Sequence, residues 1–138
     1  MTATQMIIDI HGHYTTTPPQ VGEFRQRQIE QFNLNGSVMT DPPAVSNDEI
    51  RAGIEPNQLA RMKERGVDLT VFSPKAVGMD HHQGNEATNV VWARYCNDLV
   101  HRVCRMYPSS FAGVGMLPQA AGVPPRNAVI DEVRRCVD

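Results

Sequence analysis

The chain has 138 residues, of which 41% are hydrophobic and 20% are charged, and its formal net charge is -2. These values are typical of one globular domain and exclude a disordered or fibrous chain. It contains no dense basic block and no run of about 18 apolar residues, so we expect neither a nucleic-acid partner nor a membrane span. The cysteines form no CxxC pair and are expected to be free thiols in a reducing cytoplasm: Cys96, Cys104 and Cys136.

The first predicted strand is an isoleucine-rich run at residues 6–13, which ends in the sequence HGH. A polar, proline-containing stretch follows at residues 15–45, and it is longer than most connections between elements. We therefore expect a long loop there, either functional or poorly ordered, within which Val21–Phe32 could form a short helix.

The second helix is predicted to begin at residues 46–49, SNDE, because the serine and glutamate side chains can each bond the other's backbone amide. Pro56 should kink or split this helix, since proline removes one amide donor and clashes with the preceding turn. Gly66 should end it. The next apolar run, Val67–Ser73, predicts the second strand, which Pro74 closes.

The clearest helical pattern spans residues 87–107, and apolar residues recur there every three or four positions. Phe111–Leu117 is expected to be the third strand, and a last helix should begin near Arg126. The residues expected on the apolar face of the long helix are Trp92, Cys96, Leu99, Val103 and Met106. Those expected on the buried face of the last helix are Ile130, Val133 and Val137.

The element order β-α-β-α-β-α predicts parallel strands joined by helical crossovers. We expect the α/β fold class, as about three β/α units from the N-terminal part of a (β/α)8 TIM-type barrel. Residues 1–138 would then be a single partial barrel domain, truncated at its C-terminus, because a closed barrel takes about 250 residues. A complete small three-layer domain is the alternative.

The HGH sequence suggests a metal site at the carboxyl end of the first strand, where barrel active sites are built. Side chains alternate along a strand, so Asp9, His11 and His13 are expected on one face, with same-face neighbours about 6.6 Å apart. Two imidazoles at this spacing can lean onto one zinc ion. The alternative is that both histidines simply end the strand and face solvent.

Four segments together resemble one known family: MIIDIHGHYT, NQLARMKERGVDLTVFSPKA, WARYCNDLVHRV and FAGVGMLPQ. They resemble the amidohydrolase-related metal enzymes of the amidohydrolase-2 group, and within it the hydratases of protocatechuate 4,5-cleavage catabolism more than the decarboxylases. The resemblance implies a divalent metal, expected to be Zn²⁺, held by His11 and His13 together with later ligands that this chain lacks. It also implies a longer homo-oligomeric enzyme, of which the chain alone would be inactive.

The implied reaction adds water to a conjugated, unsaturated oxo-tricarboxylate. For this small polycarboxylate, Ser73 and Lys75 at the end of the second strand are the expected contacts, although Lys75 could equally be a solvated loop lysine. Arg25 and Arg27 could close over a polyanion. A zinc-dependent decarboxylase or hydrolase, and an inactive truncated domain, are the alternatives. Tyr14 could point into the site, or it could pack at its rim. His81 and His82 are expected in a solvated loop, where one of them could contact the substrate.

Overall fold

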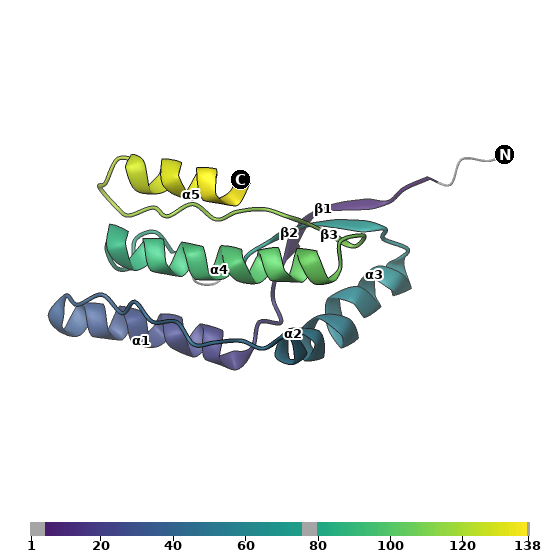
Figure 1. The fold of residues 1–138 in the computed structure, drawn as a ribbon, viewed down its shortest axis with the longest axis horizontal. Helices are drawn as coiled ribbons and strands as arrows, with labels where there is room; N and C mark the ends of the chain where they lie inside the picture. The colour runs from purple at the N-terminus through teal and green to yellow at the C-terminus, as the bar shows by residue number, and fades with distance from the viewer. Residues whose placement is uncertain (1–4, 76–79, 138) are drawn as a thin grey trace.

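The computed structural model describes residues 5–75 and 80–137 (Figure 1). Its sheet has three strands: β1 (Ile8–His13), β2 (Leu69–Ser73) and β3 (Phe111–Gly113). They lie in the order β1-β2-β3, and both pairs are parallel. Helices separate the strands along the chain, so the expected alternation and the expected parallel pairing are both confirmed.

The possible short helix at Val21–Phe32 is confirmed and is longer than expected, because α1 spans Pro19–Asn35. It takes up most of the stretch 15–45, which is therefore not one long loop. Pro19 occupies the first helical position, where a missing amide donor costs nothing, and Gly36 ends the helix with a φ of 74°. The apolar periodicity of this helix is weak, because its buried positions mix apolar and polar side chains. The buried residues are Val21, Phe24, Arg25 and Gln28.

Pro56 splits the second helical segment as predicted. Helix α2 (Asn47–Ile54) begins at the Ser46–Glu49 capping box, in which both reciprocal hydrogen bonds are present. A π-helical turn, η1 (Glu55–Leu59), follows at the proline, and α3 (Ala60–Arg65) then runs to Gly66. A π turn accommodates the missing amide without ending the helix.

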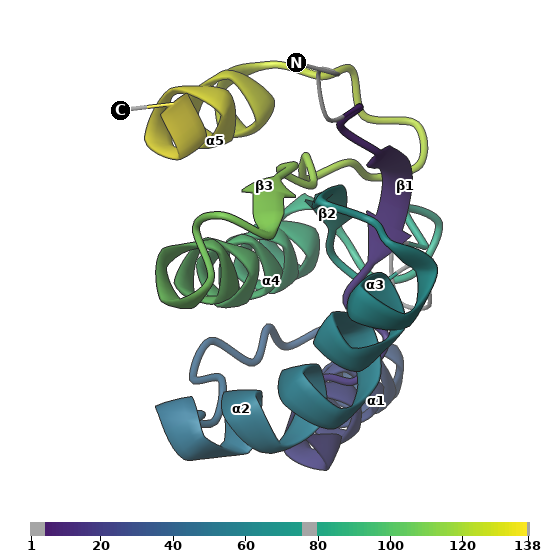
Figure 2. The same cartoon turned by 90° about the vertical axis from the view of Figure 1, so that its right-hand side faces the viewer.

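Helix α4 (Glu86–Met106) confirms the strongest helical pattern, and its apolar stripe lies in the core. In Figure 2, α3 and α4 lie on the same side of the strands. Side chains of the sheet that point to this side are buried, among them Thr70, Phe72 and Phe111. The other side is open among the described residues, since Ile10 is 79% exposed.

The third strand ends at Gly113, four residues earlier than expected. The side chain of Asn97 on α4 accounts for this: its amide nitrogen donates to the Met116 carbonyl at 2.8 Å, and its oxygen accepts from the Met116 amide at 2.7 Å. The Val114 amide still donates to the Phe72 carbonyl of β2 at 2.9 Å, but the backbone at Met116 is paired with a side chain of α4.

Helix α5 (Asn127–Val137) runs beside α4, and α1, α4 and α5 form three nearly parallel rods in Figure 1. The predicted buried face of α5 is wrong: Ile130, Val133 and Val137 are exposed. The helix is attached through Glu132 instead, a fully buried carboxylate that accepts from Asn97 and Arg135 at 2.7 Å each. No helix of the described residues is long and apolar enough to cross a membrane.

Candidate functional site

The imidazoles of His11 and His13 converge at the carboxyl end of β1. Their Nε2 atoms are 3.0 Å apart, and the two rings lie edge to face with centroids 4.8 Å apart. The other ring nitrogen of His13, Nδ1, lies 2.9 Å from the Pro74 carbonyl oxygen. A carbonyl oxygen only accepts hydrogen bonds, so Nδ1 carries the proton and Nε2 presents a lone pair toward His11.

A β-bulge in β1 changes the face on which Asp9 lies. Asp9 pairs with Thr70, and Gly12 pairs with Phe72. The chain therefore advances three residues along β1 but two residues along β2, which is a β-bulge. Paired residues point to the same side of a sheet. Asp9 therefore shares the helix-covered side with Thr70, whereas His13 shares the open side with its partner Ser73. The expectation that Asp9 lies on the face of the histidines is wrong.

Asp9 still contacts the histidine segment, through the backbone. Its Oδ1 accepts a hydrogen bond from the His11 amide at 3.1 Å, which holds the bulged residue in place. Gly12 allows the bulge to pack tightly, because a Cβ atom there would lie 2.2 Å from the Thr70 methyl carbon. The carboxylate thus supports the backbone of the histidine segment, and Asp9 and His13 also line one cavity of about 310 Å³.

The π turn η1 braces the residues that follow the histidine pair. Gln58 donates to the Thr15 hydroxyl at 3.1 Å and accepts from the Thr16 hydroxyl at 2.7 Å. At Gly53 the helix comes so close that a Cβ atom would lie 2.5 Å from the Thr16 carbonyl oxygen. The turn introduced by Pro56 thereby fixes the exit from β1.

Tyr14 points into the core and not into the site. It is 1% exposed, its ring lies 5.5 Å from that of Phe72, and burial raises its pKa to about 12. Its amide donates to the Ser73 carbonyl at 2.8 Å, which extends the β1–β2 pairing past the histidines. Tyr14 therefore has a packing role, as the rim-packing alternative expected, and does not contribute a group to the site.

The structure separates the two predicted substrate contacts, Ser73 and Lys75. Ser73 is half-buried and lies directly beside His13 in the sheet register. Lys75 instead lines a cavity of about 330 Å³ against α1, together with Arg25, Asp80 and Trp92. Only Ser73 is therefore brought to the histidine pair.

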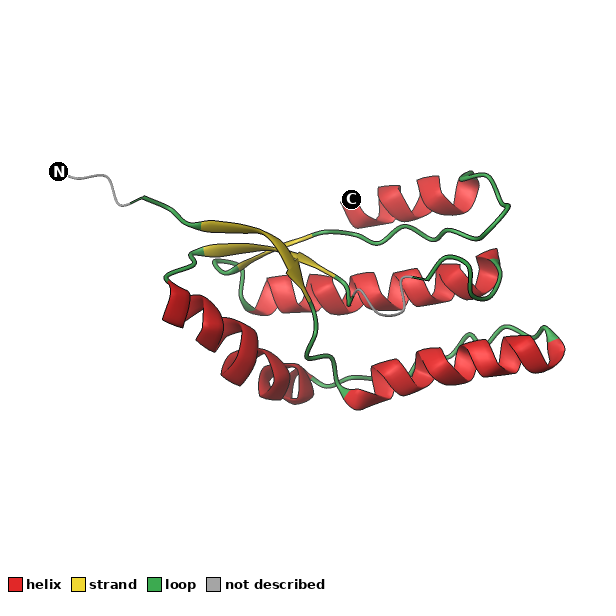
Figure 3. Ribbon diagram, turned by 180° about the vertical axis from the view of Figure 1, so that it is seen from behind, coloured by secondary structure: helices red, strands yellow, loops and turns green. Residues whose placement is uncertain are grey.

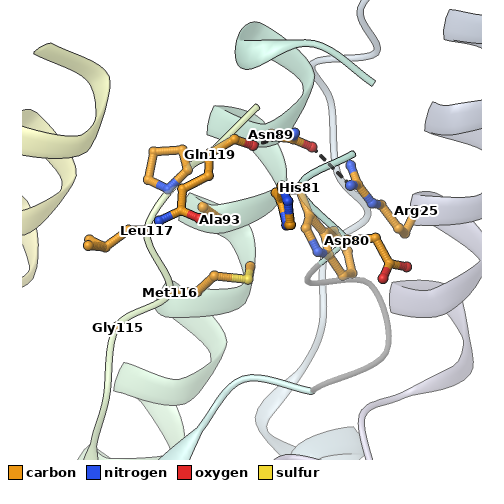
Figure 4. A pocket seen from close by; sticks show the side chains of 11 residues that line it. Arg25, Asp80, His81, Asn89, Ala93, Gly115, Met116, Leu117 and Gln119 are labelled. Atoms are coloured by element: carbon orange, nitrogen blue, oxygen red, sulfur yellow. Dashed lines mark hydrogen bonds between the residues drawn. The ribbon is translucent and has the colours of Figure 1, made fainter. Parts of the chain in front are cut away.

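A second cavity, of about 250 Å³, shares Arg25, Asp80 and Trp92 with the first (Figure 4). Arg25 is buried and lies between α1 and α4, whereas Arg27 is exposed. The Arg25 guanidinium donates to Gln28 and to Asn89, both at 2.9 Å, and stacks over Trp92 with 5.4 Å to the ring centroid. The sequence suggested that Arg25 could close over a polyanion from a loop, but it did not indicate that this arginine is buried on a helix beside a cavity.

His81 and His82 are both exposed, with their ring centroids 5.8 Å apart. His81 lines the smaller cavity, which fits the expectation that one of the two could contact a ligand. Within residues 5–75 and 80–137, no group of three or more His, Cys, Asp or Glu side chains is arranged to hold a metal ion. His11 and His13 thus form a pair of donors, not a complete cluster.

Comparisons with known proteins agree with the resemblance seen in the sequence. The family model Amidohydro_2 (amidohydrolase) matches residues 8–138. The chain is 45% identical over 133 residues to a 2-keto-4-carboxy-3-hexenedioate hydratase of Sphingobium sp. (strain NBRC 103272 / SYK-6), and the match covers 96% of this chain and 38% of that protein. The family resemblance is therefore confirmed, and this relative is a hydratase by name.

Two solved structures extend this likeness to the fold. A 4-oxalomesaconate hydratase from Rhodopseudomonas palustris superposes with a TM-score of 0.84 at 43% identity, covering 96% of this chain and 39% of that one. A 5-carboxyvanillate decarboxylase from Sphingomonas paucimobilis has a TM-score of 0.60 at 23% identity, covering 96% and 39%, and shows likeness of fold alone. The chain spans about two-fifths of the length of these relatives, and the predicted fold class, three β/α units of a TIM-type barrel, is confirmed.

Proposed function

Since this chain belongs to the amidohydrolase family, we propose that it contributes the first part of a metal-dependent hydro-lyase of the 4-oxalomesaconate hydratase type. The proposed reaction adds water across a carbon–carbon double bond conjugated to carbonyl and carboxylate groups. Two relatives more than 40% identical to the chain are hydratases by name, which supports this reaction over decarboxylation. The pathway is aromatic catabolism by protocatechuate 4,5-cleavage.

The observation that carries this proposal is the convergence of His11 and His13. Their Nε2 atoms are 3.0 Å apart, so one zinc ion could bind both at the roughly 2.0–2.1 Å that zinc–imidazole bonds require. The hydrogen bond from His13 Nδ1 to Pro74 leaves Nε2 free, which is the usual support of a histidine ligand. The residues present therefore fit a divalent ion. The family implies such an ion, and zinc is our choice because two imidazoles favour it.

A bound ion would act as a Lewis acid on the oxygens of the substrate or on the water that attacks it. The residues of this chain would position the reactants around it. Pro74 holds the His13 ring in one orientation, and the Asp9 carboxylate holds the backbone of His11. Ser73, beside His13 in the register, presents a hydroxyl group from which a substrate carboxylate can accept a hydrogen bond. Lys75 lies in the cavity against α1 and would add a positive charge there, away from the histidine pair.

Several features of the whole protein belong to the same proposal. We place it in a reducing cytoplasm, which suits the three free cysteines among the described residues. We propose a homo-oligomer in the longer form. The 138-residue chain alone should have negligible activity, because its histidine pair supplies two donors of the roughly four that zinc requires.

The test is an assay of the longest open reading frame that contains this chain, purified with and without Zn²⁺. The substrate is the unsaturated oxo-tricarboxylate, and loss of its conjugated absorbance reports hydration. We expect zinc-dependent activity that falls at least 100-fold in His11→Ala and in His13→Ala. His101→Ala, at an exposed position on α4, is the matched control. Activity that survives loss of both histidines would exclude their role, and release of carbon dioxide in place of hydration would indicate a decarboxylase.

A further inference from the structure

The two cavities that share Arg25, Asp80 and Trp92 lie on the side of the fold where the proposed chemistry takes place. Their walls come from α1, from the segments that follow β2 and β3, and from the first turns of α4. All of these segments follow the carboxyl end of a parallel strand. Figure 3 shows the starts of α4 and α5 together at this end of the molecule. Ligands of such folds bind at this end.

Arg25 brings a buried positive charge to these cavities. It is 7% exposed, and among residues 5–75 and 80–137 no carboxylate forms an ion pair with it. Its two hydrogen-bond partners, Gln28 and Asn89, are neutral amides. Burial lowers the pKa of its guanidinium from the usual value. The nearby Asp80 carboxylate favours the charged form of Arg25 but does not pair with it, so a bound anion would further offset the cost of burying this charge.

Trp92 supplies an independent sign of a ligand in the same cavities. It is 3% exposed, and within the part of the chain that the structure describes its Nε1 is buried without a hydrogen-bond acceptor. Buried indole N–H groups usually have an acceptor. The Arg25 guanidinium lies over the same indole, 5.4 Å from the ring centroid, so both donors belong to the walls of the same cavities.

We propose that the cavity between α1, α4 and the segment after β3 binds a carboxylate group through the Arg25 guanidinium and the Trp92 indole N–H. Identification of the carboxylate as part of a small polycarboxylate rests on the proposed function. Asp80 also lines both cavities, where it accepts from Gln83 at 3.1 Å, and its negative charge limits the number of carboxylates that can bind beside Arg25. Lys75 in the adjoining cavity offers a second cation for another carboxylate of the same molecule.

The chain itself carries a probe for this site, because Trp92 is its single tryptophan. The indole N–H therefore gives one resonance in a ¹H–¹⁵N correlation spectrum. We would titrate the metal-free 138-residue chain, in EDTA, with propane-1,2,3-tricarboxylate, which has no double bond to hydrate. A saturable shift of the indole resonance with a Kd of about 1 mM or tighter is expected. No saturable shift, or the same shift with sodium chloride at equal ionic strength, would overturn the proposal.

Two variants test the role of the charge. Arg25→Gln should weaken binding at least tenfold, about 1.4 kcal/mol, whereas Arg27→Gln, exposed on the same helix, should leave it within about twofold. If Arg25→Gln loses the dispersed indole resonance of the folded chain, Asn89→Asp gives the same answer. It places a carboxylate on Arg25 where an amide oxygen now lies at 2.9 Å, and should abolish the response. Full binding by either folded variant would contradict the proposal. Because neither metal nor turnover is involved, the outcome is independent of whether the longer protein is a hydratase.

Discussion

His13 and Pro74 are joined across the first strand pair by a hydrogen bond of 2.9 Å from Nδ1 to the carbonyl oxygen. The two residues are 61 positions apart, so the contact exists only when β1 and β2 are paired. It fixes both the tautomer and the direction of the imidazole. The fold thus fixes the orientation of the His13 imidazole before any ion binds. A short peptide with the same HGH sequence would lack this constraint.

Zinc binding by the chain alone should be weak and should depend on both histidines. Two imidazole donors leave the remaining positions of the ion to water, so we expect a Kd weaker than about 10 μM by competition with a fluorescent chelator. His11→Ala or His13→Ala should abolish this binding, and His101→Ala should not change it. Tight binding of one zinc ion per chain would contradict the two-donor site.

Gly12→Ala should destabilise the chain by about 2–3 kcal/mol, because its Cβ would lie 2.2 Å from the Thr70 methyl carbon. Chemical denaturation followed by circular dichroism measures the change. Gly22→Ala is the matched control, since a Cβ atom there meets nothing within 4 Å and alanine favours helix by about 1 kcal/mol. Thr70→Ser removes the clashing methyl group and should restore part of the loss. Equal stability of the Gly12 and Gly22 variants would contradict the close contact.

Much of the fold follows from local signals in the sequence. The capping box at Ser46, the break at Pro56 and the stop at Gly66 each depend on one or two residues, and the structure has all three. The long stripe of α4 is equally local, because its spacing is visible within one window. Such features could be predicted, since their causes lie within a few residues of one another.

The features that the sequence did not predict depend on distant partners. The bulge that turns Asp9 away from His13 arises from the register between β1 and β2. The buried face of α5 is set by Asn97 and Arg135 around Glu132, so its apolar residues remain exposed. Helix α1 buries Arg25 and Gln28, which conceals its periodicity. The histidine pair could be predicted as a candidate metal site, but the cavity around Trp92 required the structure.

Glu132 should make the attachment of α5 depend on pH. Burial alone would raise the pKa of this carboxyl, but hydrogen bonds from Arg135 and Asn97 outweigh that effect and lower it. A lowered pKa contributes stability above the unfolded value of about 4.3, and that contribution is lost as the pH falls through the folded pKa. Glu132→Gln should therefore cost about 2–3 kcal/mol at pH 7 and much less near pH 3. Denaturation at the two pH values measures this, and an equal loss at both would exclude the carboxylate as the cause.

Self-association of the 138-residue chain is expected through β1. This strand lies at an edge of the sheet, and it presents Ile8 and Ile10 at 45% and 79% exposure. An unpaired edge with exposed isoleucines is a template for pairing with another chain. Light scattering after gel filtration should show dimers or larger species at about 100 μM, and Ile10→Lys should shift them toward monomer. Leu34→Lys, at a position 83% exposed on α1 and away from the edge, is the control and should change little. A monomeric parent chain would contradict the role of this edge.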